Sequence, residues 1–519
     1  MSNKLVVLIN PGHDDEVDPK VAISYGARSR KIQRNDPPIS IINLGGFIRD
    51  HGYDVVILDT HVEKDYNNRL RELIKARPLV IGFSVILGKF TKNAMTLTKM
   101  IKDIDRDIPV VWWGKLAHLA QDIILDFPCV DYLVIGDGEM PFLNLLNCLR
   151  DEKDFRGIPG IGFREKGAKI INPDSHQIER LDSIYISKDF GWDIVKQHIN
   201  YRQVPYFINL YTSRGCKFNC SFCYLKDIKQ YKSKIRLRRR SAENIISEIE
   251  YLHKAFGINV VTFGDDDFLS TVDEILPVLQ YLRKNNIFIE HIWTNVYNLK
   301  PEAISLLEGL CQTVCYSIET ASPRLQRILN KLIPQERIIE VNTQLRKAGI
   351  NTVHNILFGI PTETDEETKL NVDLLKKLKQ VNPYMRANTY ILSPIPETPI
   401  FKFAKKLSGA KIQWDLEDLA NFHFRYMGRA ASKFRPYFTP DDNLFYETVS
   451  ELTNELFIEL NSALTEDQMK KIHADRRVSY IFGEISEINK PIDKTRKYIL
   501  DQVLEAMDNG LPQPKIQPF

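Results

Sequence analysis

The sequence is short of cysteine, glycine and proline, and it has no long apolar run. Its 519 residues hold 7 cysteines, 25 glycines and 26 prolines. Glycine and proline at this level exclude a fibrous or low-complexity protein, and seven cysteines are too few for a disulfide framework at this length. The best apolar run, Leu79 to Leu87, contains Gly82 and Ser84. It is far shorter than the ~20 residues that a membrane helix needs.

A strong excess of charge of either sign is also absent. The 70 Lys and Arg residues nearly balance the 67 Asp and Glu residues, so composition does not indicate a nucleic-acid partner. Near the N-terminus only Leu5 to Ile9 are apolar before Asn10-Pro11-Gly12, which predicts a strand and a turn rather than a signal peptide. We therefore expect a cytoplasmic protein with no membrane span.

What the sequence does contain is a repeated alternation of strand and helix patterns. Over residues 1–150 this alternation predicts a doubly wound parallel sheet, a Rossmann-like arrangement. Residues 151–200 have the pattern of a connector with a hairpin. Six further strand–helix units over 201–400 predict a partial barrel of the (β/α)6 TIM type, and residues 401–519 look mostly helical. The expected class is therefore α/β with a helical C-terminal region.

The carboxyl ends of parallel strands are where such sheets bind ligands. In the first sheet these ends carry Ser84, Gly114 and the run Gly136-Asp137-Gly138-Glu139. The glycines would let a ligand approach the backbone closely, or they serve only as tight turns.

Three of the seven cysteines, Cys216, Cys220 and Cys223, crowd into eight residues directly after the first expected barrel strand. Three thiolates at this spacing can hold one corner of an iron–sulfur cubane, which normally takes four cysteines. With only three local ligands, one iron stays open for an exogenous ligand. A structural zinc site would need a fourth Cys or His nearby, and residues 224–250 contain neither. A buried position is disfavoured by the polar residues of the loop.

The spacing C-x3-C-x2-C at the end of the first barrel strand resembles the radical S-adenosylmethionine (SAM) superfamily. Later strand ends agree with this family, and the first sheet is similar to the cobalamin (B12)-binding domain of its cobalamin-dependent members. The resemblance covers about residues 1–400. The segments that carry it are Phe263–Phe268, Tyr316–Ser322, Asn330-Lys331, Phe358–Thr364 and Pro394–Pro399 in the barrel, with Pro37-Pro38 and Val134–Glu139 in the first sheet.

This resemblance implies a chemistry carried by cofactors. In the family, SAM chelates the open iron of the 4Fe–4S cluster. An electron from the cluster then cleaves SAM to a 5′-deoxyadenosyl radical, which abstracts hydrogen from an unactivated carbon. In the cobalamin-dependent members, methylcobalamin commonly supplies a methyl group to the substrate radical.

The resemblance also assigns roles to individual residues. The three cysteines ligate the cluster. Phe222 lies near the adenine, and Glu319 with its neighbour Ser322 contacts the amino group or ribose of SAM. Asp265 and Asp266 are candidates for the SAM amino group, because a cation needs an anionic acceptor; the alternative for both is a solvated turn. The expected cobalamin-binding residues are Ser84, Gly114, Gly136, Gly138 and Glu139.

Some features depart from the family pattern. Asp59-Thr60-His61 imitates a motif that supplies an axial histidine to cobalamin, but Lys64 stands where that motif has glycine; we interpret His61 as a loop histidine. Trp113 is large enough to crowd a corrin or to stack on it. The eight basic residues of 226–240 could contact phosphates, although a solvated face is favoured.

We expect a cobalamin-dependent radical SAM C-methyltransferase with a small-molecule or peptide substrate and a reducing partner such as flavodoxin or ferredoxin. The alternatives are a radical cyclase, oxidase or carbon–carbon coupling enzyme, or a non-catalytic iron–sulfur or corrinoid-binding protein. The aromatic residues of the C-terminal region suit either a ring-bearing substrate or a core, and a core is favoured. They are Trp414, Phe422, Phe424, Tyr426, Tyr437 and Phe438.

Overall fold

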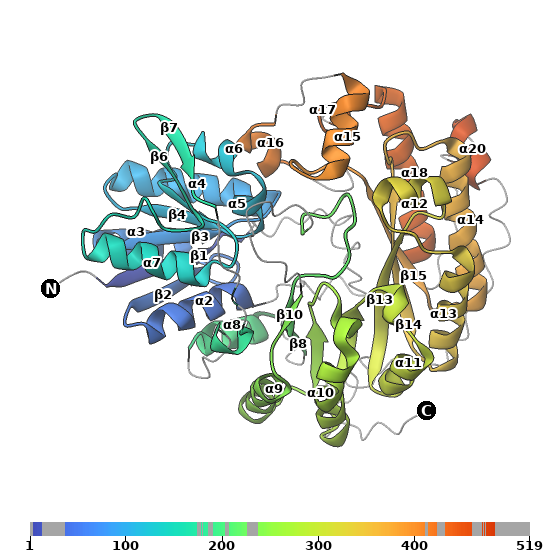
Figure 1. The fold of residues 1–519 in the computed structure, drawn as a ribbon, viewed down its shortest axis with the longest axis horizontal. Coiled ribbons are helices and arrows are strands. Elements are labelled where there is room, and N and C mark those ends of the chain that lie inside the picture. The colour runs from blue at the N-terminus through green and yellow to red at the C-terminus, as the bar shows by residue number, and fades with distance from the viewer. Residues whose placement is uncertain are drawn as a thin grey trace.

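Two sheets with flanking helices lie side by side, and the C-terminal helices pack against both (Figure 1). The computed structural model describes residues 4–12, 37–173, 178, 180–184, 190–202, 207–225, 237–409, 414–422, 431–458, 470, 472 and 474–482. None of the described helices combines the length and the apolar character needed to cross a membrane.

Within the described ranges, the first sheet has seven strands in the order β2-β1-β3-β4-β5-β6-β7. The first five are parallel to one another, which confirms the predicted doubly wound sheet. The expected hairpin is present as β6 and β7, but it extends this sheet through antiparallel pairing with β5. The strands are β1 Leu5–Asn10, β2 Asp54–Asp59, β3 Val80–Ser84, β4 Val110–Trp113, β5 Tyr132–Val134, β6 Ile161–Glu165 and β7 Ala168–Ile171.

Helices cover both faces of this sheet because its strands are apolar on both sides. One face packs against α2 and α7, and the other against α3 to α6. The helices are α2 Ile39–Asp50, α3 Tyr66–Lys75, α4 Lys89–Ile104, α5 Lys115–Leu119, α6 Gln121–Leu125 and α7 Glu139–Arg150. A short turn η1 Leu181–Ile184 and helix α8 Trp192–Arg202 lead to the second sheet.

The second sheet has six strands in the order β15-β14-β13-β12-β11-β8 within the described residues. All neighbours are parallel and follow one another along the chain, so the predicted partial barrel is confirmed. The strands are β8 Phe207–Leu210, β11 Val260–Phe263, β12 Phe288–Trp293, β13 Cys311–Glu319, β14 Asn351–Phe358 and β15 Arg386–Ile391. A separate two-stranded ladder joins β9 Ser213–Arg214 to β10 Arg238–Arg239.

Helices follow the barrel strands in turn and pack on their outer face. The helix after β14 begins at a capping box, in which Thr364 and Glu367 bond to each other's backbone N–H groups. The helices and short turns are α9 Ala242–Phe256, η2 Phe268–Thr271, α10 Val272–Lys284, η3 Val296–Asn298, α11 Pro301–Leu307, α12 Pro323–Leu329, α13 Gln335–Lys347 and α14 Asp365–Val381.

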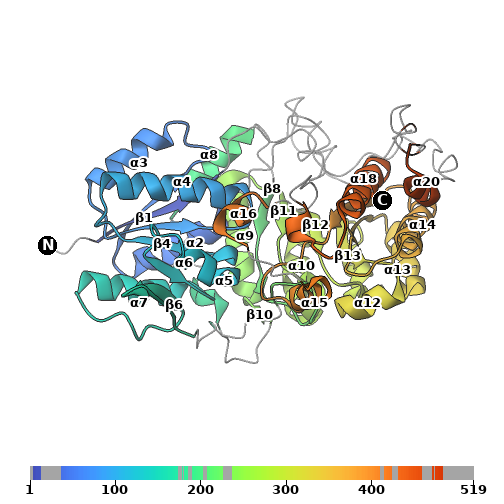
Figure 2. The same ribbon diagram turned by 90° about the horizontal axis from the view of Figure 1, so that it is seen from above.

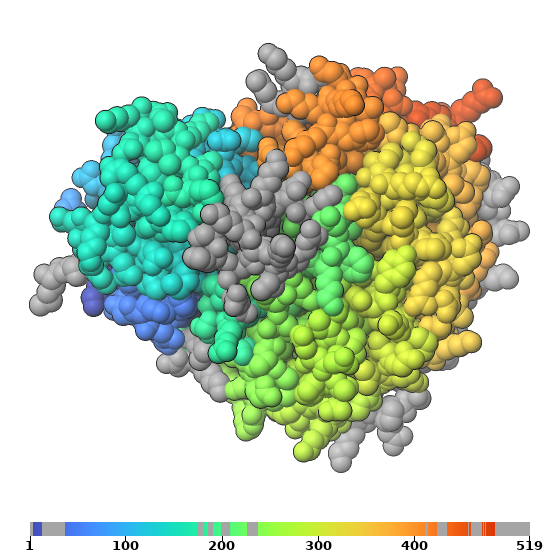
Figure 3. Space-filling view, in the orientation of Figure 1, coloured from blue at the N-terminus to red at the C-terminus, as the bar shows by residue number. Residues whose placement is uncertain are grey.

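The described C-terminal part is helical, as predicted. Trp414 and Phe422, which flank α16, join the core of the first sheet together with Phe434, so α15 to α17 bridge the two halves (Figure 3). Seen from above, α18 and α20 lie beside α14 (Figure 2). The helices are α15 Pro399–Ser408, α16 Leu416–Ala420, α17 Ala431–Phe434, α18 Pro440–Ile458 and α20 Arg476–Phe482.

The C-terminal aromatic residues are mostly core, as favoured from the sequence. Trp414 contacts the ring of Phe434 at 4.8 Å between centroids. Tyr437 donates hydrogen bonds to the carbonyls of Gly359 (3.3 Å) and Leu392 (3.0 Å), at the ends of β14 and β15. Phe424 and Tyr426 lie outside the described residues.

Candidate functional site

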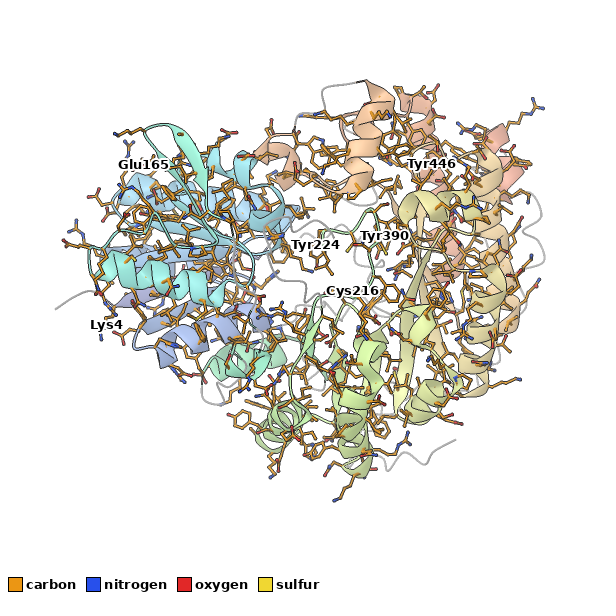
Figure 4. The ribbon with its side chains drawn as sticks, viewed as in Figure 1. Lys4, Glu165, Cys216, Tyr224, Tyr390 and Tyr446 are labelled. Atoms are coloured by element: carbon orange, nitrogen blue, oxygen red, sulfur yellow. The ribbon has the colours of Figure 1, made fainter. Side chains whose placement is uncertain are left out.

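The loop with the three cysteines leaves the carboxyl edge of the barrel sheet. Ser221 anchors this loop to the end of α12. Its backbone N–H donates to the carbonyl of Leu329 (2.8 Å), and its hydroxyl donates to the carbonyl of Ile328 (2.7 Å). Figure 4 places Cys216 and Tyr224, at the two ends of the loop, near the middle of the molecule. The cysteines are therefore presented by a fixed backbone between the two sheets.

The three thiols are half-buried and lie near one another. Burial raises the pKa of Cys216 to about 11 and that of Cys223 to about 12, and the nearby Asp266 adds to both shifts. Such thiols become thiolates when a bound metal replaces their protons. Among the described residues, no group of three His, Cys, Asp or Glu side chains is arranged to hold a single metal ion. The donor set fits a multinuclear iron–sulfur cluster, which has several irons to share among cysteines.

Three consecutive aspartates follow β11, and they have different environments. Asp265 is buried and accepts hydrogen bonds from the backbone N–H (3.1 Å) and hydroxyl (2.8 Å) of Thr212. Asp267 is buried as well and accepts from groups of residues 294–298. Asp266 is accessible to solvent but surrounded by protein, which raises its pKa. Of the two predicted SAM-binding aspartates, Asp266 is thus the one with an accessible carboxylate.

Glu319 ends β13 in a strained backbone conformation. Its φ is +67°, a region that long side chains rarely occupy and that is often found at functional sites. The carboxylate is buried and forms an ion pair with Lys331, with 2.9 Å between Oε1 of Glu319 and Nζ of Lys331. Ser322, the neighbouring candidate, caps α12 by accepting from the Leu325 N–H (3.2 Å), and its hydroxyl donates to Glu367 (2.6 Å).

Phe222, the aromatic residue of the cysteine loop, packs against a small apolar cluster at the barrel's carboxyl edge. Tyr390 of β15 also borders this cluster, and Figure 4 shows its side chain close to the middle of the molecule. An apolar wall of this kind suits the flat face of a purine. The buried members of the cluster are Leu325, Leu329, Leu357, Ile360, Leu392 and Ile400.

A row of polar side chains crosses the concave face of the barrel sheet. Asn355 donates to the hydroxyl of Ser317 (3.1 Å) and accepts from Asn388 (3.4 Å). The three residues are direct neighbours in the strand register and are all half-buried. The inner layers of a closed barrel are usually bulky and apolar. This row therefore gives the inner face hydrogen-bonding capacity without net charge.

The glycines at the carboxyl edge of the first sheet differ in backbone conformation and in whether a side chain would fit. Gly114 has a φ of +101°, and a Cβ there would lie 2.8 Å from the carbonyl oxygen of Val85. Gly136 also has positive φ. Gly138 has helical φ and would accept a Cβ with ordinary contacts. Ser84 is half-buried at the end of β3.

Two residues singled out near this edge belong to the surrounding packing. The ring of Trp113 is buried and makes an edge contact with Phe142 (5.6 Å between centroids). The expectation that this ring crowds or stacks on a corrin is therefore wrong, since the ring lies in the core on one face of the sheet. His61 lies in the turn after β2, beside the ring of Phe90 at 5.5 Å.

The end of β5 is joined to the strand before the cysteine loop by buried ion pairs, which the sequence did not suggest. Arg214 pairs with Asp137 (3.2 Å) and, through two nitrogens, with Glu139 (2.6 and 3.1 Å). Arg238 also pairs with Asp137 and donates to the carbonyl of Ile178 (2.8 Å). Burial raises the pKa of Asp137, but the hydrogen bond and charges of the two arginines outweigh it, so the pKa is lowered.

The solvated-face interpretation of the basic run is wrong for its last three residues. Arg238, Arg239 and Arg240 have side chains that are 7%, 2% and 1% exposed. Each is engaged by a carboxylate, and for Arg240 the partner is Glu248 at 2.6 Å. Buried charges are expected to be paired in this way. The rest of the run, residues 226–236, lies outside the described residues.

Lys115 makes a second contact between the two halves. It begins α5 at the edge of the first sheet, and its ammonium lies 4.8 Å from the ring centroid of Tyr224, the residue after Cys223. Its charge also lowers the pKa of Asp266, against the larger effect of burial. The ligand-binding edge of the first sheet and the cysteine loop therefore face one another.

Comparison with known families agrees with both halves of this site. The radical SAM superfamily profile matches residues 210–375, and the B12-binding domain profile matches residues 30–146. The chain is a B12-binding radical SAM enzyme. Its cofactors are a 4Fe–4S cluster, SAM and cobalamin.

Relatives of this radical SAM enzyme have more than one named activity. An uncharacterized methyltransferase of Pyrococcus horikoshii is 28% identical over 387 residues, 73% of this chain and 80% of that protein. An anaerobic magnesium-protoporphyrin IX monomethyl ester cyclase of Rubrivivax gelatinosus is 26% identical over 399 residues, 73% of this chain and 68% of that protein. The fold is similar to that of the methyltransferase TsrM of Kitasatospora setae with cobalamin and a 4Fe-4S cluster bound. That likeness has a TM-score of 0.62, 20% identity and 79% coverage of each chain.

Proposed function

We propose that this radical SAM enzyme is a cobalamin-dependent methyltransferase that methylates an unactivated carbon. The observation that carries the proposal is the approach of the two cofactor-binding regions. Arg214, two residues before Cys216, is ion-paired with the end of β5 at the edge of the B12-binding sheet. Two cofactors that act on one substrate need such proximity. The relative from Pyrococcus horikoshii, which is named a methyltransferase, supports the same activity.

Within this proposal the chain's own residues bind and orient the cofactors. Cys216, Cys220 and Cys223 hold the cluster. Asp266 accepts the SAM amino group, because it is an accessible carboxylate near the thiols. Glu319, fixed by Lys331, accepts hydrogen bonds from the SAM ribose or amino group, and Phe222 lies against the adenine. When bound, SAM supplies the radical and cobalamin the methyl group.

We further propose a small-molecule or peptide substrate that lies over the polar row on the concave face of the barrel. Ser317, Asn355 and Asn388 would bind its neutral amide or hydroxyl groups. An external reductant such as flavodoxin or ferredoxin would supply the electron that cleaves SAM. A cytoplasmic location follows from the need for a reducing environment around thiolate-bound iron.

A radical cyclase of the same architecture is the second candidate. The observation that favours it is the cyclase of Rubrivivax gelatinosus, whose identity to this chain is nearly as high as that of the named methyltransferase. An oxidase or a carbon–carbon coupling enzyme would use the same cofactors and is tested together with the cyclase. Either reaction would cleave SAM but leave no methyl group in the product.

The test uses the full chain, purified without oxygen and supplied with iron, sulfide and hydroxocobalamin. It is incubated with a reductant, methyl-labelled SAM and a metabolite extract from its host. A methyltransferase gives a labelled product together with 5′-deoxyadenosine. A new product without label would support a cyclase, an oxidase or a coupling enzyme. Absence of SAM cleavage would leave a non-catalytic iron–sulfur or corrinoid-binding protein.

Cysteine variants provide the matched control for this test. Cys216→Ser should lose bound iron and all SAM cleavage. Cys311→Ser should keep both, because Cys311 is buried in the barrel core, where its thiol bonds the carbonyl of Thr313 at 3.3 Å. Equal iron contents in the two variants would contradict the assigned cluster loop.

A further inference from the structure

A buried ion network joins the two halves of the enzyme at the point where their cofactor-binding edges meet. Asp137 lies in the turn between β5 and α7 and is 6% exposed, and Glu139, the first residue of α7, is 4% exposed. Arg214 and Arg238 come from the paired strands β9 and β10, which flank the cysteine loop in sequence. The family resemblance assigns Glu139 to the cobalamin site, and in the structure both of its carboxylate oxygens accept hydrogen bonds from Arg214. The other three side chains have no assigned part in cofactor binding.

Stability alone is a weak reason for such a network. Burying charges is costly, and a buried ion pair replaced by apolar residues of similar volume often leaves a protein equally or more stable. What an arginine–carboxylate pair adds is orientation, because the guanidinium is planar and donates two parallel hydrogen bonds. Arg214 uses both terminal nitrogens on Glu139 and one of them also on Asp137.

The location of the network determines what it can orient. Arg214 is separated from Cys216 by Gly215 alone, and Glu139 lies three residues after Gly136 at the carboxyl end of β5. A movement of one half relative to the other would therefore change the separation between the cysteine loop and the B12-binding edge. The same four side chains would have to break their hydrogen bonds for this to happen.

We propose that Asp137, Glu139, Arg214 and Arg238 are positioning residues that fix the cluster site relative to the cobalamin site. This inference rests on the proposed function, in which both cofactors act in one reaction. SAM that binds at the barrel must then reach cobalamin on the facing sheet, so a small displacement should impair methyl transfer to cobalamin. Radical formation needs only the cysteine loop and the barrel residues, and it should continue.

The variants are chosen to separate orientation from folding. Glu139→Gln keeps the shape of the side chain and removes its charge. Arg214→Lys keeps the charge but removes the planar guanidinium that donates two parallel hydrogen bonds. Arg240→Met is the matched control, since it breaks a buried arginine–carboxylate pair (2.6 Å to Glu248) that lies wholly within the barrel half. Circular dichroism and bound iron show whether each variant folds and loads its cluster.

The first readout is the relative position of the two halves without any cofactor. Spin labels are attached through azidophenylalanine at the exposed residues Glu72 in α3 and Glu302 in α11. The wild type and Arg240→Met should give one narrow distance distribution. Glu139→Gln and Arg214→Lys should broaden or shift it. Distributions in these two variants that match the control would overturn the proposal.

The second readout compares two soluble products of SAM in the loaded, reduced enzyme with added cobalamin. Transfer of the SAM methyl group to two-electron-reduced cobalamin releases S-adenosylhomocysteine. One-electron cleavage of SAM instead releases methionine and a 5′-deoxyadenosyl radical, which becomes 5′-deoxyadenosine by taking a hydrogen atom from the substrate or the solvent. In Glu139→Gln and Arg214→Lys we expect S-adenosylhomocysteine formation to fall about 100-fold, the loss that a misplacement of about 1 Å can cause. 5′-Deoxyadenosine formation should stay within about twofold of the wild type.

Failure of the proposed function would give a different pattern. A wild-type enzyme that binds no cobalamin or forms no S-adenosylhomocysteine would contradict the methyltransferase proposal, while the label distances would still decide whether the network positions the two halves. A parallel loss of both products in the folded, iron-loaded variants would contradict the positioning role, because it would place these residues in SAM binding or cleavage.

Discussion

The three aspartates after β11 show how one residue type takes two roles within three positions. Asp265 and Asp267 are buried, and each accepts several hydrogen bonds from neighbouring strand ends. Asp266 alone of the three is exposed. The sequence predicted a carboxylate here but could not tell which one, because the choice depends on donors such as Thr212 that are far away along the chain.

Asparagine variants of this trio should therefore separate stability from cofactor binding. Asp266→Asn should unfold at the same urea concentration as the wild type, but its affinity for SAM should fall at least about tenfold through loss of one charged hydrogen bond, about 1.5–3 kcal/mol. Asp265→Asn should lose about 1–3 kcal/mol of folding free energy, because an amide cannot accept all of the buried donors. Urea titration and equilibrium SAM binding measure the two effects. Equal SAM affinities in Asp266→Asn and the wild type would exclude the assigned role.

A buried histidine should limit stability in acid. His354 of β14 is fully buried beside the ring of Tyr316, and burial lowers its pKa to about 3, against 6.5 for an ordinary histidine. The unfolded chain therefore binds a proton that the folded chain does not, and stability from the neutral ring is lost as the pH falls from 6.5 towards 3.

In His354→Leu the free energy of unfolding should fall less steeply as the pH drops below 6.5, as measured by urea unfolding at several pH values. Part of this loss of stability in acid should remain, because burial also lowers the pKa of His118, to about 4. Curves for the variant and the wild type that stay parallel below about pH 6 would show that His354 is not a source of the acid sensitivity.

At the scale of elements, the last barrel strand shows how the C-terminal helices complete the sheet. β15 is an edge strand, and an open edge is a site for unwanted pairing. Asn454 of α18 bonds to both backbone groups of Thr389: its side-chain oxygen accepts from the N–H at 2.9 Å, and its nitrogen donates to the carbonyl at 3.5 Å. One carboxamide thus replaces the missing neighbouring strand at this position.

Asn454→Leu should destabilise the fold by about 1–3 kcal/mol, because it leaves the buried backbone N–H of Thr389 without an acceptor. Thr448→Val on the same helix should change stability by less than about 0.5 kcal/mol, since the hydroxyl of Thr448 bonds only within its own helix at the surface. Urea unfolding of the two variants is the measurement. A difference between them smaller than the error would show that the strand edge does not depend on Asn454.

The strands themselves were predictable because their apolar runs are continuous and local. The capping box at Thr364 and Glu367 was predictable for the same reason, since its partners are three residues apart. The edge contact of Asn454 was not, because its partner Thr389 lies 65 residues away and a polar residue on an amphipathic helix is usually solvated.

At the scale of the whole molecule, the sequence predicted two α/β units but not how they are joined. The cysteine ligands were identifiable because their spacing is a local signature. The contacts between Arg214 and the pair Asp137 and Glu139 span more than 70 residues. Basic and acidic residues in loops give no local sign of such pairing, and for the same reason the sequence favours a solvated face for Arg238, which is also paired with Asp137.

A further connection between the halves is apolar, and it should contribute strongly to stability. Trp414 is 8% exposed and packs with Phe401, Phe422 and Phe434 into the core cluster of the first sheet. Truncation of a buried aromatic side chain costs about 3–5 kcal/mol through lost burial and the cavity left behind. Trp414→Ala should therefore lower the free energy of unfolding by that amount.

The destabilisation caused by Trp414→Ala should be largest in the part of the first sheet that the C-terminal segment contacts. Hydrogen exchange should become faster in α4, because α16 packs directly on it and the carbonyl of Leu419 accepts from the N–H of Gly88 at 2.9 Å. Leu444→Ala, at a position 65% exposed, is the control and should change stability by less than about 0.5 kcal/mol. If Trp414→Ala leaves exchange in α4 unchanged, the C-terminal segment does not stabilise the first sheet, and the ion network of Arg214 would be left as the main connection between the halves.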